Sequence, residues 1–158
     1  MKPFRVIDCI PKRFPQKGFR LEHDGKLFDF TPYANLSGWK IAVGNVQYTI
    51  RRKGLLRFRW SMMHGSDTLI TAEHDATQFH IDIISPSSVM RAERNPLIFL
   101  STVDLVHGQE ILAKIAPKHP FASAIRITLF TRDLPTETIL FAVCLAISLW
   151  SPLPWRFR

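Results

Sequence analysis

The chain has 158 residues, of which 46% are hydrophobic and 22% charged, and its formal net charge is +8 at pH 7. This length fits one domain with a real hydrophobic core, and the composition excludes disorder over the whole chain. The excess of positive charge favours an anionic partner, which would be nucleic acid, anionic lipid headgroups or an acidic protein surface.

The first eighteen residues predict a basic arm before the folded domain. Cations alternate with phenylalanines here, so the arm could meet the headgroups of a membrane or the bases and phosphates of single-stranded nucleic acid. A loosely ordered arm with no ligand is the alternative. Asp8 interrupts the first apolar stretch, which excludes the uncharged region of a secretory signal and predicts a cytoplasmic protein. The cations are Lys2, Arg5, Lys12, Arg13, Lys17 and Arg20, with Phe4, Phe14 and Phe19 between them.

Residues 19–131 predict a series of short strands, because segments rich in β-branched and aromatic residues alternate with turn signals. The clearest signal is Asp24-Gly25, which is typical of a two-residue hairpin turn, at the middle of residues 19–30. Short strands at even spacing favour a sandwich or a barrel. After this hairpin the predicted strands are residues 40–52, 55–63, 68–73, 78–84, 97–106, 109–116 and 124–131.

One long apolar run, residues 139–150, predicts a helix over about residues 136–150. Pro135 before the run and Pro152 after it are usual positions of proline around a helix. The run rises about 18 Å, whereas a bilayer core is about 30 Å thick. A helix that is apolar on every side must still be buried. We therefore predict a mainly β fold over residues 19–158, a closed antiparallel barrel whose interior this helix fills.

The last third of the sequence has a strand-like segment, residues 125–135, that leads into the apolar run. Residues 48–58 have a similar strand-like pattern. This succession resembles the tubby C-terminal-like superfamily, which includes tubby proteins, phospholipid scramblases and plant LURP-one-related proteins. The resemblance implies a closed barrel of about twelve strands around a central C-terminal helix. It also implies binding of an anionic lipid, because tubby domains bind phosphoinositides through basic residues.

The densest group of cations lies in the middle of the sequence. If residues 55–60 form a strand, Arg57 and Arg59 point to one face, while Phe58 and Trp60 point to the other. Guanidinium groups that converge in this way could hold phosphates through paired hydrogen bonds. The alternative is the solvated outer face of a half-buried strand. The group consists of Arg51, Arg52, Lys53, Arg57 and Arg59.

The sequence contains no motif that supports catalysis. It has no G-x-S-x-G, no Walker loop and no G-x-G-x-x-G, and its carboxylates lack partners at functional spacing. Cys9 and Cys144 lie far apart and predict core thiols rather than a metal cluster. His74, His80 and Asp82 offer metal donors but match no ligand motif. We therefore expect no enzyme activity, no cofactor and no metal.

The sequence thus predicts a non-enzymatic binding module that recognises an anionic membrane lipid or a phosphorylated headgroup at the inner face of a membrane. A scaffold protein that binds an acidic protein partner is the main alternative, and nucleic-acid binding and carriage of a hydrophobic ligand are two more. A basic-aromatic tail, residues 155–158, could anchor at an interface or pack against the barrel. The predicted binding residues are Arg51, Arg52, Lys53, Arg57, Arg59, Lys12 and Arg13.

Overall fold

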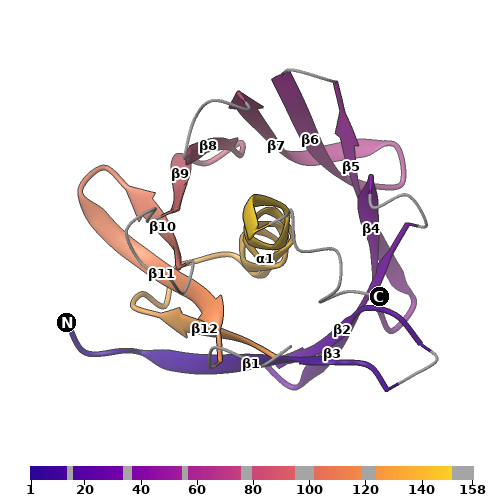
Figure 1. The fold of residues 1–158 in the computed structure, drawn as a ribbon, viewed down its shortest axis with the longest axis horizontal. Coiled ribbons are helices and arrows are strands. Elements are labelled where there is room, and N and C mark those ends of the chain that lie inside the picture. Colours follow the sequence, from indigo (N-terminus) through magenta and orange to yellow (C-terminus); the bar gives the residue numbers. More distant parts are fainter. Residues whose placement is uncertain are drawn as a thin grey trace.

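Twelve antiparallel strands form a closed ring around one helix, seen along the barrel axis in Figure 1. The computed structural model describes residues 1–13, 16–33, 37–54, 57–75, 80–94, 102–118 and 124–150. Each strand pairs with its sequence neighbours, and β1 pairs with β12, which closes the ring. The strands are β1 (Arg5–Pro11), β2 (Phe19–His23), β3 (Lys26–Pro32), β4 (Gly38–Val43), β5 (Val46–Lys53), β6 (Arg57–His64), β7 (Asp67–Asp75), β8 (His80–Ile84), β9 (Val89–Arg94), β10 (Val103–His107), β11 (Glu110–Pro117) and β12 (Ile125–Leu129).

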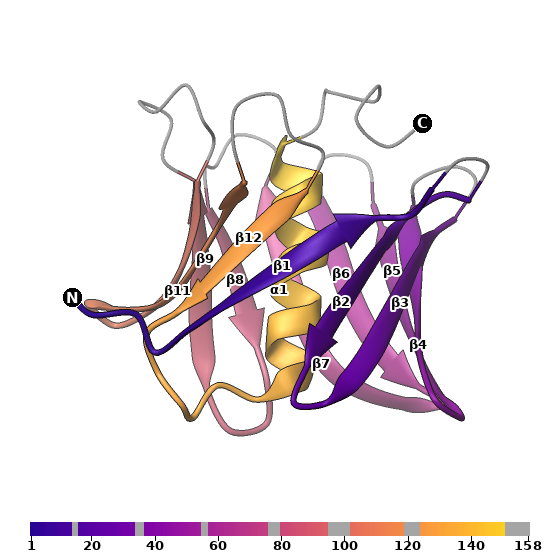
Figure 2. The ribbon, with the colours of Figure 1, turned by 90° about the horizontal axis from the view of Figure 1, so that it is seen from below.

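Helix α1 (Thr136–Trp150) runs along the barrel axis, as Figure 2 shows from the side. All residues from Ile139 to Ile147 are buried, which explains why the run has no polar face. The Tyr48 hydroxyl donates a hydrogen bond of 3.4 Å to the Glu137 carboxylate and so joins the first turn of the helix to β5. Within the described ranges, α1 falls short of the length that a membrane-spanning helix needs. The predicted fold class, a mainly β closed antiparallel barrel around a C-terminal helix, is confirmed.

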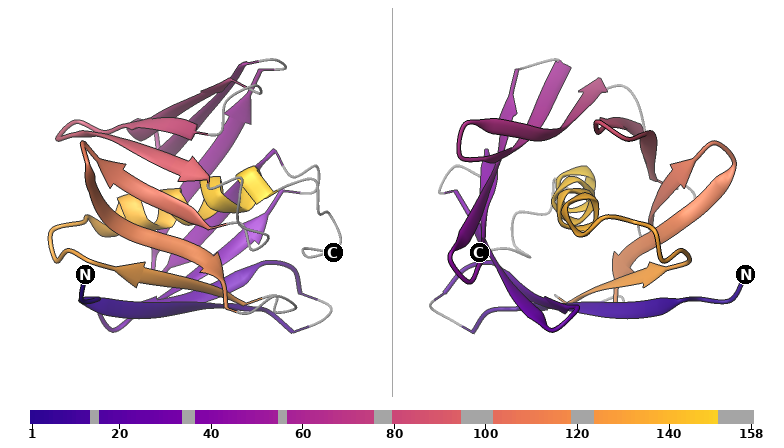
Figure 3. Two further views of the ribbon diagram at one scale, coloured as in Figure 1. Left: turned by 60° about the vertical axis from the view of Figure 1, so that its left-hand side comes forward. Right: turned by 180° about the vertical axis from the view of Figure 1, so that it is seen from behind.

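Side chains of different size fill the two sides of the barrel interior. Strand side chains alternate between interior and solvent, as the pleat requires. The inward positions of β7–β12 are mostly aliphatic, and α1 packs closest to β9, whose inward residues are Met90 and Ala92. Larger rings line the opposite wall, β2–β6, which the right-hand view of Figure 3 shows in indigo to purple on the other side of α1. These rings, on β2–β6, are Phe19, Phe28, Phe30, Trp39 and Trp60.

The strand predictions need two corrections. Residues 40–52 form two strands, β4 and β5, because Gly44 adopts a φ of +54° and begins a turn with Asn45. The sequence pattern does not predict β9, because Met90 and Ala92 are its buried apolar residues in an otherwise charged segment. Parts of three predicted strands (residues 55–56, 78–79 and 97–101) and the tail at residues 155–158 lie outside the described residues.

The predicted arm over residues 1–18 also needs correction. Arg5–Pro11 form β1, which pairs with β12 on one side and with β2 on the other. Asp8 and Pro11 suggest irregular structure in the sequence, but Ile7 and Cys9 are buried at alternate positions and face the core. The folded domain therefore begins at β1 rather than at residue 19.

The barrel has two ends, which we name by the direction of α1. The proximal end is where α1 begins, and it carries the tight turns that follow β2, β4, β6, β8 and β10. The distal end is where α1 finishes, and it carries the connections that follow β1, β3, β5, β7, β9 and β11. Every second connection of an antiparallel ring lies at the same end, so segments far apart in the sequence meet there.

Candidate functional site

Basic residues gather at the distal end of the barrel. The β1–β2 and β5–β6 connections both lie at this end, although β3 and β4 stand between the two strand pairs. In the part of the chain that the structure describes, Asp75 is the only acidic residue among the distal strand ends and connections. The basic residues at these positions are Lys12, Arg13, Lys17, Lys53, Arg57, Arg94 and Lys118.

The proximal end has a different charge balance. Over the described residues, its strand ends and connections, together with the residues before β1, hold acidic and basic residues in equal number. The molecule is therefore electrically polar along the barrel axis, with the positive pole at the distal end. The proximal residues are Asp24, Asp67, Glu110 and Asp133 with Lys2, Arg5, Lys26 and Arg132.

The pairing of β5 with β6 divides the predicted cation cluster between two faces of the wall. Arg52 lies opposite the buried Trp60, so it is on the interior side at the distal rim. Lys53 lies opposite Arg59, on the outer side. The burial pattern of β6 confirms the predicted alternation, since Trp60 is buried and Arg59 is exposed.

The guanidinium groups of Arg51 and Arg52 lie over the faces of aromatic side chains. Arg52 lies 4.8 Å from the centroid of the Phe58 ring and 5.7 Å from that of Trp60. Arg51 lies 5.1 Å from the centroid of the Tyr33 ring. Cation–π contacts orient a guanidinium without neutralising its charge. Among the described residues, no carboxylate forms an ion pair with either arginine, so both charges remain open to a partner.

Arg59, in contrast, is already neutralised. Its Nε and terminal nitrogen donate hydrogen bonds of 3.2 and 2.7 Å to the Glu73 carboxylate on β7. On the outer face, Asp82 of β8 lies across from Glu73 and forms an ion pair with Arg91 at 3.1 Å. Arg59 therefore joins two strands rather than offering an open site. The five predicted cations do not converge on one point, which corrects that expectation.

A cleft of about 490 Å³ opens beside β5, β6 and β7. Lys53 and Arg57 line it together with Phe58 and His74, whose rings stack with centroids 6.2 Å apart. Glu73 also lines the cleft and offsets part of its positive charge. Its chemistry suits a ligand that has both an anionic group and a flat surface.

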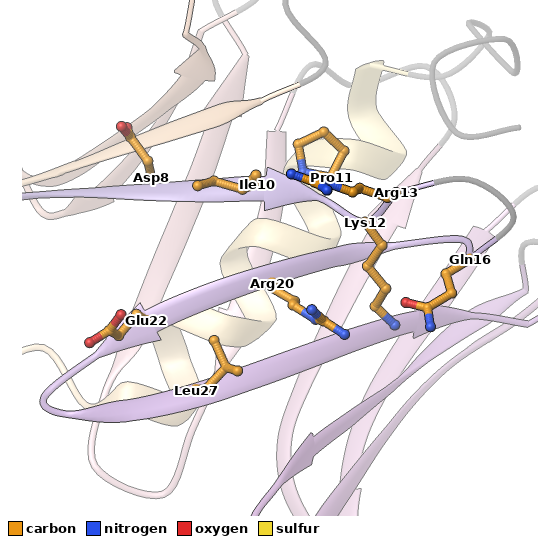
Figure 4. A pocket seen from close by; sticks show the side chains of 9 residues that line it. All are labelled: Asp8, Ile10, Pro11, Lys12, Arg13, Gln16, Arg20, Glu22 and Leu27. Atoms are coloured by element: carbon orange, nitrogen blue, oxygen red, sulfur yellow. The ribbon is translucent and has the colours of Figure 1, made fainter.

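Lys12 and Arg13 lie at the distal end of β1 and differ in their surroundings. The Lys12 side chain is only 7% exposed, and its ammonium group forms an ion pair with Asp29 and donates a hydrogen bond of 2.9 Å to Thr31. Arg13 is exposed, and no carboxylate of the described residues pairs with it. Both line a groove of about 550 Å³ over β1–β3, shown in Figure 4.

The predicted metal donors do not come together. His74 stacks on Phe58, whereas His80 and Asp82 alternate with buried residues of β8 and face outward. The described residues contain no group of three or more His, Cys, Asp or Glu that could hold a metal ion. Cys9 is fully buried, which raises the pKa of its thiol to about 12.

Comparisons with known proteins assign no family to this chain. A scan against protein-family models gave no match, and searches of curated proteins and of solved structures also found none. The candidate site therefore depends on its residues and their geometry.

Sequence reasoning missed two aliphatic residues that line the groove of Figure 4, Ile10 and Leu27, whereas Arg20 belongs to the predicted basic set. A signal for them exists in the alternation of each strand. Ile10 and Leu27 are next to the buried Cys9 and Phe28, so they are aliphatic residues at outward positions. Without the strand assignment of residues 5–11, this break in the pattern cannot be recognised.

Proposed function

We propose that this protein is a non-enzymatic binding module whose distal end meets an anionic membrane surface or a phosphorylated headgroup. The observation that supports it best is that two basic segments, at the ends of β1 and β5, lie at the same end of the barrel. The proximal end is balanced in charge, so a negatively charged surface would attract the molecule with its distal end foremost.

The individual side chains support this proposal. Arg51 and Arg52 are oriented by ring contacts and are free of carboxylate partners in the described part of the chain. A guanidinium in this state can donate paired hydrogen bonds to phosphate oxygens. Each cation near an anionic bilayer contributes roughly 1 kcal/mol, so Arg51, Arg52, Lys53 and Arg13 together would give useful peripheral binding.

The architecture supports the same proposal. A closed ring of twelve strands around a helix is the arrangement that the resemblance to the tubby C-terminal-like superfamily implies. Because one fold can host several functions, this agreement adds weight to lipid binding but leaves the choice of headgroup to experiment.

Co-sedimentation with vesicles tests the proposal. We expect the protein to bind vesicles that contain phosphatidylserine, not vesicles of phosphatidylcholine alone, and to dissociate as salt is raised. Replacing Arg51→Glu and Lys53→Glu together should weaken the binding by at least about tenfold, because two attractive contacts become repulsive. Each substituted side chain is exposed, so the fold should be retained.

A matched control keeps the change of net charge constant. Lys2→Glu with Lys26→Glu makes the same change at the proximal end, where both side chains are exposed. This control should bind nearly as well as the wild-type protein. If the two double variants lose binding equally, or if no anionic vesicle binds at low salt, the distal end is not the membrane-facing surface.

A further inference from the structure

The groove over β1, β2 and β3 has an aliphatic floor on the outside of the barrel (Figure 4). Ile10 is 58% exposed and Leu27 is 54% exposed, although both occupy outward positions where polar residues are usual. The connection between β1 and β2 begins two residues after Ile10 and is closed by a hydrogen bond of 3.0 Å from the Lys12 amide to the Gly18 carbonyl. These side chains therefore line a hollow rather than standing as isolated surface residues.

Charges of opposite sign stand at the two ends of this groove. Arg13 lies at the distal end, and Arg20 lies across from Ile10 on β2. Glu22 lies toward the proximal end, across from Leu27. Neither Arg13 nor Glu22 forms an ion pair within the described residues, so both charges are available to a partner.

The remaining charged groups of the groove are already satisfied by the protein. The Lys12 ammonium and the Arg20 guanidinium both form ion pairs with Asp29, that of Arg20 at 3.6 Å. Asp8 accepts hydrogen bonds of 3.0 Å from Arg126 and 3.1 Å from Lys118. A partner therefore meets an aliphatic floor, an open cation at one end and an open carboxylate at the other.

We propose that this groove binds an extended peptide segment of a partner protein, in which aliphatic side chains stand between an acidic and a basic one. The aliphatic side chains would cover Ile10 and Leu27, the carboxylate would bind Arg13, and the basic group would bind Glu22. Such a segment matches the open ends in charge, whereas an anionic bilayer would bring negative charge against Glu22. The groove is also large enough for side chains to enter, at about 550 Å³.

This site is separate from the membrane-facing rim at β5. The groove lies on the flank of the barrel, over β1–β3, while Arg51 and Arg52 belong to β5. Arg13 belongs to both surfaces, whereas Ile10 and Leu27 belong to the groove alone and Arg51 and Lys53 to the rim alone, so variants at these residues test the two proposals independently.

The test is a titration of the ¹⁵N-labelled protein with short synthetic peptides, followed by two-dimensional NMR. The first, called the leucine–glutamate peptide, has leucines between a glutamate and a lysine; the second replaces its leucines by serine, and the third replaces its glutamate by lysine. We expect saturable shifts of the Ile10, Arg13 and Arg20 amides with the first peptide. The other two should bind at least about tenfold more weakly, because each lacks one half of the recognition.

Variants distinguish binding in the groove from nonspecific binding to exposed apolar side chains. The double variant Ile10→Ser with Leu27→Ser should weaken binding of the first peptide by at least about tenfold. The control variant is Ile84→Ser with Val89→Ser, which removes an aliphatic pair from another part of the wall, where Ile84 is 46% and Val89 61% exposed. This control should leave peptide binding unchanged. Arg13→Glu, at an exposed residue, provides a second test that does not depend on the aliphatic pair and should also weaken binding.

Three outcomes would overturn the proposal. The first is the absence of saturable shifts with the leucine–glutamate peptide. The second is an equal loss of binding in the two double-serine variants. The third is a set of shifts centred on β5 and β6 rather than on β1–β3. Loss of vesicle binding in Arg51→Glu/Lys53→Glu, with peptide binding retained, would confirm that the rim and the groove are distinct.

Discussion

At the scale of single residues, two aspartates on the outer wall show opposite effects of their surroundings. Asp8 accepts hydrogen bonds from Arg126 and Lys118, and these contacts lower the pKa of its carboxyl group. Its charged form stabilises the fold above the unfolded pKa of about 3.9, and this contribution is lost as the pH falls through the lower folded pKa. Asp104 lies in the opposite situation, because burial and the neighbouring Glu93 raise its pKa.

The first prediction concerns Asp104→Asn. The Oδ1 atom of Asp104 is buried without a hydrogen-bond donor, and Lys114 is 3.8 Å away. A raised folded pKa means that stability falls as the pH rises from about 3.9 through the folded value. Near neutral pH the neutral amide should therefore raise the free energy of unfolding by about 0.2–1 kcal/mol, the range of one cross-strand charge pair.

Urea unfolding near neutral pH and at acid pH measures this effect. Below about pH 3.9 the wild-type carboxyl group is protonated in both states, so the advantage of the variant should disappear there. A variant that is less stable than wild type near neutral pH would show that the attraction of Lys114 outweighs burial and the repulsion of Glu93.

The second prediction concerns the two thiols, which are both buried and both have a raised pKa, mainly because of burial. Cys9 belongs to β1 and Cys144 to α1, so a reagent reaches them only when the wall or the helix opens. We expect negligible labelling by an alkylating reagent under native conditions and complete labelling in denaturant, followed by mass spectrometry. Rapid native labelling of Cys144 would mean that α1 leaves the barrel readily.

At the scale of elements, the turn after β5 positions the candidate rim. Gly54 has a φ of +102°, and a Cβ atom there would lie 1.9 Å from the carbonyl oxygen of Arg57. The chain before and after this glycine therefore approaches at a distance that no other residue type allows. Lys53 and Arg57 stand on either side of it, so their relative position depends on this one residue.

The third prediction follows from this geometry. Gly54→Ala should lower the free energy of unfolding by about 1–3 kcal/mol through strain and steric overlap, and it should also weaken vesicle binding. Gly65→Ala is the matched control, because Gly65 has a φ of +60° but no atom within 4 Å of the added Cβ. Thermal unfolding should show a smaller loss for the control. An equal loss in both variants would mean that backbone conformation alone, and not the contact with Arg57, accounts for the loss of stability.

The strands and the helix differ in how far the sequence predicts them. The apolar run that becomes α1 is visible because every position in it is apolar, and Asp24-Gly25 identifies its hairpin because Asp24 adopts a φ of +51°. β1 and β9 are hidden because a strand needs only two or three inward apolar residues, which charged neighbours obscure in the sequence. The basic residues of the candidate site are visible in the sequence, but their shared position at the distal end is not, because it depends on the alternation of connections around the ring.

At the scale of the whole molecule, the charge polarity sets the orientation of the proposed membrane contact. With the distal end against a bilayer, α1 and the barrel axis would stand roughly upright on the surface. The groove of Ile10 and Leu27 would then lie on a flank that faces water. A protein bound in this way could hold a peptide segment at a membrane, and the two ligands would compete for Arg13 alone.

The pairing of β1 with β12 also has a consequence for how the chain folds during synthesis. Arg5 lies across from Leu129, and the helix that fills the interior follows later in the sequence. A nascent chain that lacks α1 would have an open sheet with two unpaired edges and no filling for its apolar face. Closure of the ring must therefore wait until residues past 129 have left the ribosome. Before that point the apolar inner face of the open sheet is exposed, and a chaperone that covers it would prevent aggregation.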